Sequence, residues 1–318
     1  MEHLPTSKRD IVVIGASAGG VQALTAFFKA LPADVEAAFL VVLHIPAHSP
    51  SRLDQILSRA TSLPVVVAED GEPLVSRRVY VASPDKHLMV TPQGIRLSRG
   101  PKEGRARPSI DVLFRSAAVA FQARVIGIVL SGMLDDGTAG LWAIKDHQGV
   151  ALVQDPVEAL HAPMPQSAIA HVQVDLVGTV QALCHRVALL AGKEVAMRED
   201  PDSSEPLGIE THIALGGSGL KAGVMNLGKV SKYTCPDCHG VLVQIEEGSI
   251  VRFRCHTGHA YSLKSLIAEV NESIDKGLWS ALRAGEERVM LIRQVAEMAN
   301  AAGQSHEAQR CQVHAYQT

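Results

Sequence analysis

Three residue types that together can hydrolyse an ester follow three apolar segments of the chain. The pentapeptide around Ser17 fits Gly-x-Ser-x-Gly, a turn that lifts a serine hydroxyl above a sheet edge. His44 directly follows the second apolar run, and Asp135 and Asp136 follow a third. A hydroxyl becomes a nucleophile when an imidazole accepts its proton, and a carboxylate orients that imidazole. Ser17, His44 and one of the two aspartates are therefore candidates for a hydrolytic triad.

The same turn also has a nucleotide-binding interpretation, which the residues disfavour. A dinucleotide site needs Gly-x-Gly-x-x-Gly and an acidic residue after the second strand. Here Ser17 stands in place of the middle glycine, and His44 stands where the acidic residue belongs. Each residue alone has a structural alternative, because a serine can cap a helix, a histidine can cap a strand and an aspartate can begin a helix. Their coincidence at three strand ends favours a hydrolase over a nucleotide-binding oxidoreductase.

A second reactive group lies near the C-terminal end. Cys235 and Cys238 form a Cys-x-x-Cys pair, and Cys255 and His259 follow at loop distance. Two such pairs complete the tetrahedron of a structural zinc site that is closed to water. His239 and His256 are alternative fourth ligands, and a reduced redox pair is the alternative to metal. Of the two other cysteines, Cys184 is expected to be a buried thiol and Cys311 a tail residue.

The elements expected to position these residues alternate between β-branched runs and helical spacing. Near-continuous apolar runs are typical of strands covered on both faces. The predicted strands are 11–14, 39–43, 65–67, 79–81 and 125–130, and the predicted helices are 20–31, 51–60, 110–123 and 137–146. This alternation predicts an α/β fold with a doubly wound, mostly parallel sheet. The carboxyl ends of its strands would bring the candidate triad to one edge.

The chain is expected to divide into four parts. Residues 8–192 form the catalytic domain, 193–230 a linker rich in Asp, Ser, Pro and Gly, and 231–261 a zinc-ribbon-like module. Residues 262–318 form an amphipathic helical segment, with apolar side chains every three or four positions up to about residue 301. This stripe is expected to pack on the rest of the chain; a coiled coil with a partner is the alternative, although the stripe is not a strict heptad.

Composition favours a globular protein and disfavours nucleic-acid binding and membrane insertion. The 318 residues are 47% hydrophobic and 20% charged, which is typical of a chain that buries a core. A formal net charge of −3 provides no broad basic field for nucleic acid. No apolar run approaches the ~20 residues of a membrane span, and the N-terminal segment lacks the apolar stretch of a signal peptide. We expect a cytoplasmic protein that neither binds nucleic acid nor inserts into a membrane; nothing in the sequence indicates an oligomeric state.

Several blocks in order give the chain a specific resemblance to the CheB family of chemotaxis protein-glutamate methylesterases. The resemblance covers roughly residues 10–190. It rests on Ile14-Gly15-Ala16-Ser17-Ala18-Gly19-Gly20, His44-Ile45-Pro46, Ala82-Ser83-Pro84-Asp85-Lys86-His87, Arg107-Pro108-Ser109-Ile110-Asp111-Val112-Leu113-Phe114, Ser131-Gly132-Met133-Leu134-Asp135-Asp136-Gly137 and Pro163-Met164-Pro165.

The resemblance implies a role for each candidate residue. Ser17 becomes the nucleophile, His44 the base and Asp136 the orienting carboxylate, with Asp135 as the alternative acid. The family hydrolyses glutamate methyl esters on the signalling helices of chemoreceptors, and some members deamidate glutamine there, without a cofactor for catalysis. A methylated chemoreceptor or another glutamate-methylated signalling protein is thus the expected partner. The oxyanion would be bound near Ala18, Gly19 and Met133, by backbone N–H groups.

The chain also departs from the pattern of this family. Regulated members carry an N-terminal receiver domain, whereas the first catalytic strand begins here near residue 10. Control by phosphorylation of this chain is therefore not expected. A catalytically silent signalling module with the same fold is the alternative to an active esterase. The zinc-ribbon-like module has no role that the resemblance assigns.

Overall fold

The computed structural model describes residues 6–46, 50–197 and 205–304, together with residues 306, 309, 310 and 313. The chain forms two compact units, 1–266 and 267–318. The first unit contains the candidate residues of both sites.

A parallel sheet lies at the centre of the first unit. Among the described residues it has seven strands, in the order β10-β9-β8-β2-β3-β5-β4. Their bounds are β2 Ile11–Ala16, β3 Ala38–Leu43, β4 Val65–Val67, β5 Arg78–Val81, β8 Val125–Val129, β9 Val150–Gln154 and β10 Leu176–Gly178. Strands β2, β3 and β8 are buried throughout, which explains their continuous apolar sequences. The predicted doubly wound fold is confirmed.

The connections create a crevice at the centre of this sheet. Strand β2 pairs with β3 on one side and with β8 on the other, so the chain winds outward in both directions from β2. At such a switch point the loops after neighbouring strands diverge and leave a crevice at their carboxyl ends. Ser17 follows β2, His44 follows β3, and Asp136 lies in the loop after β8. The topology therefore brings together three residues that are far apart in sequence.

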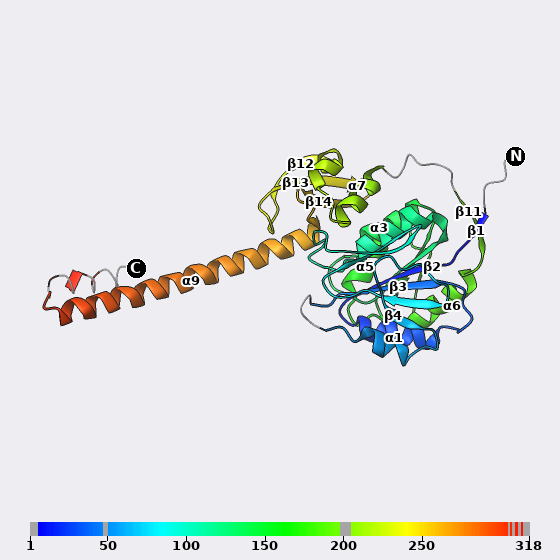
Figure 1. The fold of residues 1–318 in the computed structure, drawn as a ribbon, viewed down its shortest axis with the longest axis horizontal. Coiled ribbons are helices and arrows are strands. Elements are labelled where there is room, and N and C mark those ends of the chain that lie inside the picture. Colours follow the sequence, from blue (N-terminus) through cyan, green and yellow to red (C-terminus); the bar gives the residue numbers. More distant parts are fainter. Residues whose placement is uncertain are drawn as a thin grey trace. The chain divides into compact units, whose positions relative to one another are not determined.

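Helices cover both faces of the sheet (Figure 1). One apolar core lies under α3, α4 and α5, and the other under α1, α2 and α6. Their bounds are α1 Gly20–Ala30, α2 Leu53–Ser58, α3 Ile110–Phe121, α4 Thr138–Asp146, α5 Pro163–His171 and α6 Val180–Leu190. Each helix and strand predicted from the sequence is present, with ends shifted by a few residues.

Smaller elements flank the sheet. Strands β6 (His87–Thr91) and β7 (Gly94–Ser98) form an antiparallel hairpin. Strand β1 (Thr6–Lys8) pairs antiparallel with β11 (Glu194–Ala196), and a short 3-10 turn, η1 (Gln122–Arg124), precedes β8.

An antiparallel sheet of four strands carries the cysteine cluster. It runs β12 (Lys229–Thr234), β13 (Val241–Glu247), β14 (Ile250–Cys255) and β15 (Ala260–Ser262) in chain order. The segment 193–230, expected as a linker, holds in its described part α7 (Glu205–Ala214), α8 (Gly219–Ala222) and the turn η3 (Val224–Asn226). Helix α7 buries Leu207, Glu210 and Ile213, so this part of the segment is packed structure. The four domain boundaries stay a prediction.

Helix α9 (Leu263–Ala301) begins in the first unit and forms most of the described part of the second. The three-to-four spacing predicts an amphipathic helical segment, either one long helix or a broken one, and the structure has one continuous helix. Its apolar side chains from Ile267 to Met298 are largely exposed. Across the described ranges, no helix has both the length and the apolar character needed to cross a bilayer.

Candidate active site

Ser17 lies in the tight turn between β2 and α1. Its backbone N–H donates to the Ser131 carbonyl at 2.9 Å, and its own carbonyl accepts from Gly20 N–H at 2.8 Å. Gly19 adopts φ +75°, and a Cβ there would lie 2.6 Å from the Ser131 hydroxyl. Glycine is therefore required for this turn. The turn places the Ser17 side chain at the mouth of the crevice.

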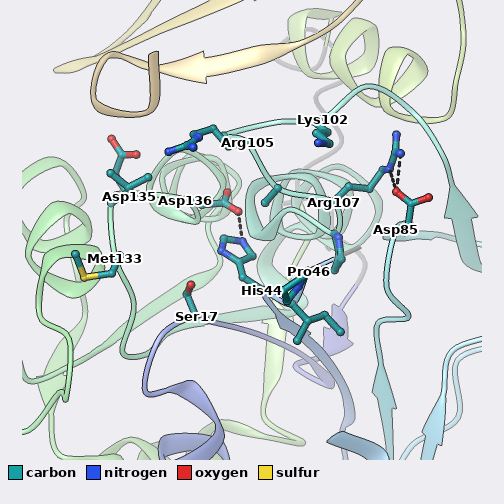
Figure 2. Close-up of a pocket in the computed structure, with 15 residues that line it drawn as sticks. Ser17, His44, Pro46, Asp85, Lys102, Arg105, Arg107, Met133, Asp135 and Asp136 are labelled. Atoms are coloured by element: carbon teal, nitrogen blue, oxygen red, sulfur yellow. Dashed lines mark hydrogen bonds and ion pairs between the residues drawn. The ribbon is translucent and has the colours of Figure 1, made fainter. Parts of the chain in front are cut away.

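His44 extends the pairing of β3 with β2 by one residue, since its N–H donates to the Ala16 carbonyl at 3.1 Å. Its Nε2 lies 2.7 Å from Asp136 Oδ2 (Figure 2). When Nε2 donates to this carboxylate, Nδ1 carries the lone pair of the neutral ring. The imidazole thus has one nitrogen held by an acid and the other available as a base.

Asp136 is almost fully buried and accepts from a set of neutral donors besides His44. Oδ1 accepts from Ser109 Oγ at 3.0 Å, from Asp111 N–H at 3.0 Å and from Gly137 N–H at 2.9 Å. Oδ2 accepts from Ile110 N–H at 2.8 Å. The N–H groups of Ile110 and Asp111 are the first two of helix α3, where the helix dipole favours an anion. A loop residue therefore caps a helix that belongs to another segment.

These donors decide the charge of Asp136. Burial by itself would raise the pKa of this carboxyl group. The hydrogen bond and charge of His44, with the N–H groups of Ile110 and Asp111, outweigh burial and lower the pKa below its ordinary value. Asp136 is therefore a carboxylate at neutral pH, the form that can hold and stabilise an imidazolium.

The neighbouring Asp135 has a different environment. Its Oδ1 accepts from Ser262 Oγ at 2.7 Å, and burial, partly offset by this hydrogen bond, raises its pKa. His44 is thus bonded to Asp136, the acid that the resemblance favours, and Asp135 faces the four-stranded sheet.

Ser17 and His44 line one pocket of about 460 Å³. Figure 2 shows the Ser17 hydroxyl on the same side of this pocket as the His44 ring. Within the described residues no hydrogen bond joins the two side chains, and catalytic hydrogen bonds often tighten only when substrate binds. The remaining lining residues are Ile45, Pro46, Asp85, Lys102, Gly104, Arg105, Ala106, Arg107, Pro108, Met133, Leu134, Asp135 and Asp136.

The expected oxyanion donors lie beside Ser17. Within the described part of the chain, the amides of Ala18, Gly19 and Met133 donate to no protein acceptor, whereas those of Ser17, Gly20 and Gly132 do. Met133 also lines the pocket, and its side chain is half exposed. These three N–H groups are free to bind a developing negative charge.

Two parts of this site were not predicted from the sequence. One is the set of donors on Asp136 from Ser109, Ile110 and Asp111; the predicted start of a helix at residue 110 was a usable signal, because helix N-termini attract anions. The other is the loop from Lys102 to Pro108, which lines the pocket and carries no periodic pattern.

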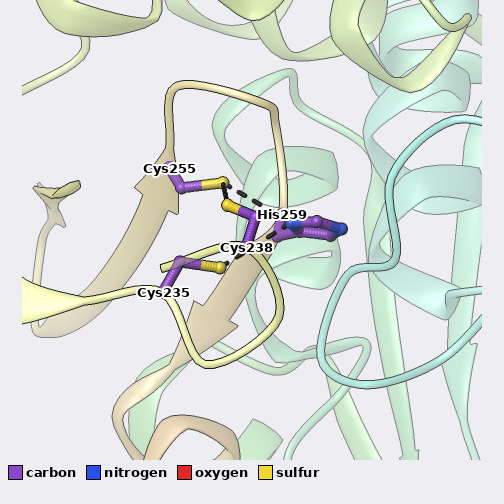
Figure 3. Close-up of side chains that lie close together, drawn as sticks. All are labelled: Cys235, Cys238, Cys255 and His259. Atoms are coloured by element: carbon purple, nitrogen blue, oxygen red, sulfur yellow. Dashed lines mark hydrogen bonds between the residues drawn. The ribbon is translucent and has the colours of Figure 1, made fainter. Parts of the chain in front are cut away.

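The four predicted metal ligands meet in a second site (Figure 3). Their ligand atoms lie within 4.8 Å of one another. Cys238 Sγ is 3.6 Å from Cys255 Sγ, and His259 Nδ1 is 3.7 Å from Cys235 Sγ and 3.6 Å from Cys255 Sγ. A tetrahedral zinc ion with its usual bond lengths separates two sulfurs by about 3.8 Å and a sulfur and a nitrogen by about 3.6 Å. The residues therefore fit zinc.

Hydrogen bonding between two of the thiols favours the thiolate of Cys255 and raises the pKa of Cys235. Hydrogen bonding with Cys235, and further with His259 and Thr257, outweighs burial and lowers the pKa of Cys255. Thr257 Oγ1 lies 2.9 Å from Cys255 Sγ and 3.2 Å from Cys238 Sγ. His239 and His256, the alternative ligands, lie outside the group of four. Cys184 is buried elsewhere, as expected, and Cys311 lies outside the described residues.

Comparisons with known proteins match the first part of the chain. The family model described as CheB methylesterase matches residues 12–187. A Leptospira interrogans protein assigned as a protein-glutamate methylesterase/protein-glutamine glutaminase is 37% identical over 175 residues, which are 55% of this chain and 91% of the relative. A Geobacter metallireducens protein-glutamate methylesterase/protein-glutamine glutaminase is 37% identical over 192 residues, 59% of this chain and 53% of the relative.

A solved structure matches the same region. The crystal structure of the Thermotoga maritima CheB methylesterase catalytic domain superposes with a TM-score of 0.56 at 30% identity. The match covers 58% of this chain and all of the Thermotoga domain.

Proposed function

The chain belongs to the CheB methylesterase family and is a carboxyl-ester hydrolase, and we propose that it hydrolyses glutamate methyl esters on the signalling helices of chemoreceptors through Ser17, His44 and Asp136. The hydrogen bond of 2.7 Å between His44 Nε2 and Asp136 Oδ2 carries this proposal. It supplies an oriented base beside the only serine that lines the described pocket.

The proposed reaction proceeds in two halves. As Ser17 Oγ attacks the ester carbonyl, His44 Nδ1 takes the hydroxyl proton, and the resulting imidazolium is stabilised by Asp136. The tetrahedral intermediate collapses when His44 returns the proton to the departing methoxide, which leaves as methanol. A water molecule, deprotonated by His44, then attacks the acyl-serine, and His44 returns this proton to Ser17 Oγ as the acyl bond breaks and the glutamate side chain leaves. No cofactor takes part in these steps.

The oxyanion formed in each half needs hydrogen-bond donors. The unpaired amides of Ala18 and Gly19 follow the nucleophile, and that of Met133 comes from the loop after β8. Losing one such donor typically costs ~10²–10³ in rate.

Glutamine deamidation fits the same machinery. The amide carbon would be attacked by Ser17, ammonia would leave in place of methanol, and the acyl-serine would be the same. The protonated His44 is needed more in this case, because an amide nitrogen leaves only after protonation. We therefore assign deamidation to this site as a second reaction on receptor glutamine side chains.

Ser17→Ala tests the proposal most directly. Without the hydroxyl no acyl-serine can form, so we expect methanol release from methylated receptor to fall by roughly three to six orders of magnitude. Ser58→Ala is the matched control, because Ser58 is exposed on α2 and bonds only the Asp54 carbonyl. Methanol release by Ser17→Ala at the rate of Ser58→Ala would refute the proposal and favour a silent module.

We also propose that Cys235, Cys238, Cys255 and His259 hold a structural zinc ion. The support is the closeness of their four ligand atoms, which lie within 4.8 Å of one another and would leave no open position on the ion for chemistry. The ion would join the turn after β12 to the turn after β14. One zinc per chain is expected by elemental analysis, and Cys235→Ser should lose it; intact thiols without metal would refute the assignment.

A further inference from the structure

One wall of the catalytic pocket is a loop without regular structure. Residues Lys102, Gly104, Arg105, Ala106, Arg107 and Pro108 of this loop line the pocket, and Asp135 lines it beside Arg105 (Figure 2). We call residues 102–108 and Asp135 the pocket wall. Gly104 and Arg105 both adopt positive φ, at 56° and 71°. Glycine adopts such a φ freely, whereas Arg105 keeps it only when its surroundings hold it.

The backbone of the wall is held by strand β15. Gly104 N–H donates to the Ala260 carbonyl at 2.8 Å, and Ala260 N–H donates to the Lys102 carbonyl at 3.2 Å. These bonds form a short parallel bridge between Glu103 and Ala260. The loop is therefore joined by an isolated β-bridge to the sheet that carries the cysteine cluster.

A buried side chain of the wall is held by strand β14. Glu103 is 3% exposed and accepts from Arg254 Nη2 at 2.8 Å and from Arg115 of helix α3. Arg254 is itself fully buried and donates from Nη1 to the Gly258 carbonyl at 2.8 Å. Burial of the carboxyl group is outweighed by the two guanidinium charges, which lower the pKa of Glu103. The loop is thus anchored near its start by a buried ion pair.

The third contact holds Asp135. Ser262, the last residue of β15, donates from Oγ to Asp135 Oδ1 at 2.7 Å. Asp135 directly precedes Asp136, the residue that holds His44. The same serine accepts from Ser265 N–H at 3.0 Å and so caps helix α9.

All three contacts lie within three residues of a metal ligand. Arg254 precedes Cys255, Ala260 follows His259, and Ser262 is two residues further on. The turn between the two ligands is closed by Cys255 N–H donating to the His259 carbonyl at 2.9 Å. We propose that the cysteine module is a positioning element of the esterase pocket: Arg254, Ala260 and Ser262 hold the pocket wall in place, and zinc at Cys255 and His259 holds these three residues.

The module acts on substrate binding more than on bond cleavage. Arg254, Ala260 and Ser262 do not line the pocket, so they are positioning residues. The wall they hold lines the same pocket as Ser17 and His44, whose own backbone N–H groups donate to Ser131 and Ala16. Release of the wall is therefore expected to raise KM with a smaller change in kcat. This kinetic consequence rests on the proposed function, while the structural coupling does not.

Three variants of Ser262 separate the contact to Asp135 from the cap of α9. Ser262→Ala loses both, Ser262→Asp keeps a capping acceptor but cannot donate to Asp135, and Ser262→Thr keeps both. We expect KM to rise about fivefold or more in the Ala and Asp variants, as for a lost hydrogen bond to a charged group, with recovery in the Thr variant. Recovery in Ser262→Asp would mean that only the cap matters, and would overturn this part of the proposal.

Hydrogen exchange tests the coupling to metal without measuring catalysis. Removing zinc with a chelator, or by Cys235→Ser, is expected to increase amide exchange across 102–108, where Gly104 N–H loses its acceptor, while strands β2 and β3 stay protected. Returning zinc to the chelated protein should restore protection. Unchanged exchange across 102–108, or a protein that binds no zinc, would overturn the coupling.

Linkage supplies the reverse measurement. If zinc holds the wall, zinc binding raises the affinity of the pocket for a ligand. A ligand that fills the pocket must then raise the affinity for zinc by the same factor. A phosphonate ester that modifies Ser17 is a suitable probe, with zinc affinity measured by competition against a chelator. Tighter zinc binding in the modified protein supports the proposal, and equal affinity contradicts it. Failure of the phosphonate to react at all would instead count against the role of Ser17, so the two proposals fail separately.

Discussion

Helix α3 contacts buried carboxylates in two regions, and the regions stabilise them in different ways. At its N-terminus, Asp136 is surrounded by neutral donors and the imidazole of His44. One and a half turns along the helix, Arg115 bonds Glu103 and lies 3.6 Å from Glu210. Arg252 and Arg254 complete that second group, which we call the arginine cluster. Both regions keep a carboxylate ionised in the interior.

The difference reflects what each carboxylate does. Fixed guanidinium charges neutralise Glu103 and Glu210. These two carboxylates therefore join chain segments and do not stabilise a positive charge at another site. The N–H dipoles around Asp136 stabilise its charge without cancelling it, and His44 is the one titratable side chain bonded to it among the described residues. A carboxylate that must stabilise a transient imidazolium therefore has neutral donors, and one that must hold chain segments together has arginines.

Asp136→Asn should have the largest effect, because it removes the charge and leaves the shape. His44 would lose the partner that fixes its tautomer and stabilises its cation, and kcat is expected to fall about 10³–10⁴-fold. The measurement is methanol release from methylated receptor at saturating substrate.

The adjacent acid provides the matched comparison for this variant. Asp135→Asn can still accept from Ser262 and does not touch His44, so we expect a loss in kcat of less than about tenfold. Equal losses in the two variants would contradict the assignment of Asp136 as the orienting acid.

Glu210→Gln should instead affect stability. Glu210 is 1% exposed and accepts from Arg252 and Arg254, so the variant leaves buried guanidinium charges without their counter-charge. Breaking a buried pair in this way typically costs about 3–5 kcal/mol in the free energy of unfolding. Urea unfolding measures it, and Glu247→Gln at the more exposed edge of the cluster is the milder control.

This expectation also distinguishes the two regions kinetically. At temperatures where Glu210→Gln remains folded, kcat should stay within about threefold of the wild type, since the cluster does not contact the reacting groups. A loss in kcat comparable to that of Asp136→Asn would show that the arginine cluster is part of the catalytic machinery after all.

The sequence predicted the catalytic region around Asp136 far better than the arginine cluster. Ser17 and His44 directly follow strands whose apolar runs are unmistakable, and a parallel sheet brings its strand ends to one edge. The metal ligands were predictable because their spacing is local. Asp136 could be told from Asp135 only through resemblance, since residue order does not show which side chain of a loop turns inward.

The arginine cluster had no sequence signal. Its members come from a loop, α3, α7 and β14, and the pair Glu103–Arg254 spans 151 positions. An isolated Arg or Glu is typical of a solvated surface, and nothing in a single sequence indicates that such charges are buried together. The segment 193–230 was interpreted as a linker for the same reason: the short amphipathic pattern of α7 is weak, and its burial depends on partners distant in sequence.

The arginine cluster also predicts how stability depends on pH. Burial would raise the pKa of Glu210, but Arg252, Arg115 and Arg254 lower it well below its ordinary value. A depressed carboxyl pKa stabilises the folded state above the unfolded pKa of about 4.3, and this contribution is lost as the pH falls toward the folded value. The free energy of unfolding should therefore decrease below about pH 4.3.

The Glu210→Gln variant isolates this contribution. Neutral glutamine does not titrate, so the difference in unfolding free energy between wild type and variant should be constant near pH 6–8 and shrink on acidification, with a slope that approaches about 1.4 kcal/mol for each pH unit below about 4.3. Urea unfolding between pH 3.5 and pH 7 measures both proteins. A difference that stays constant down to the lowest pH would mean that the arginines do not hold Glu210 ionised.

Ser109→Ala should have a much smaller effect than Asp136→Asn and tests a single member of the set of neutral donors. The Ser109 hydroxyl is one donor among several on Asp136, so its loss should raise the pKa of this carboxyl and lower kcat/KM by about tenfold. Ser116→Ala is the matched control, because Ser116 is also buried on α3 but bonds Leu113 and Val90. We expect Ser116→Ala to lower the melting temperature and leave kcat/KM near the wild-type value. If the two variants lose activity in proportion to their stability, the hydroxyl of Ser109 supports the helix and not the charge of Asp136.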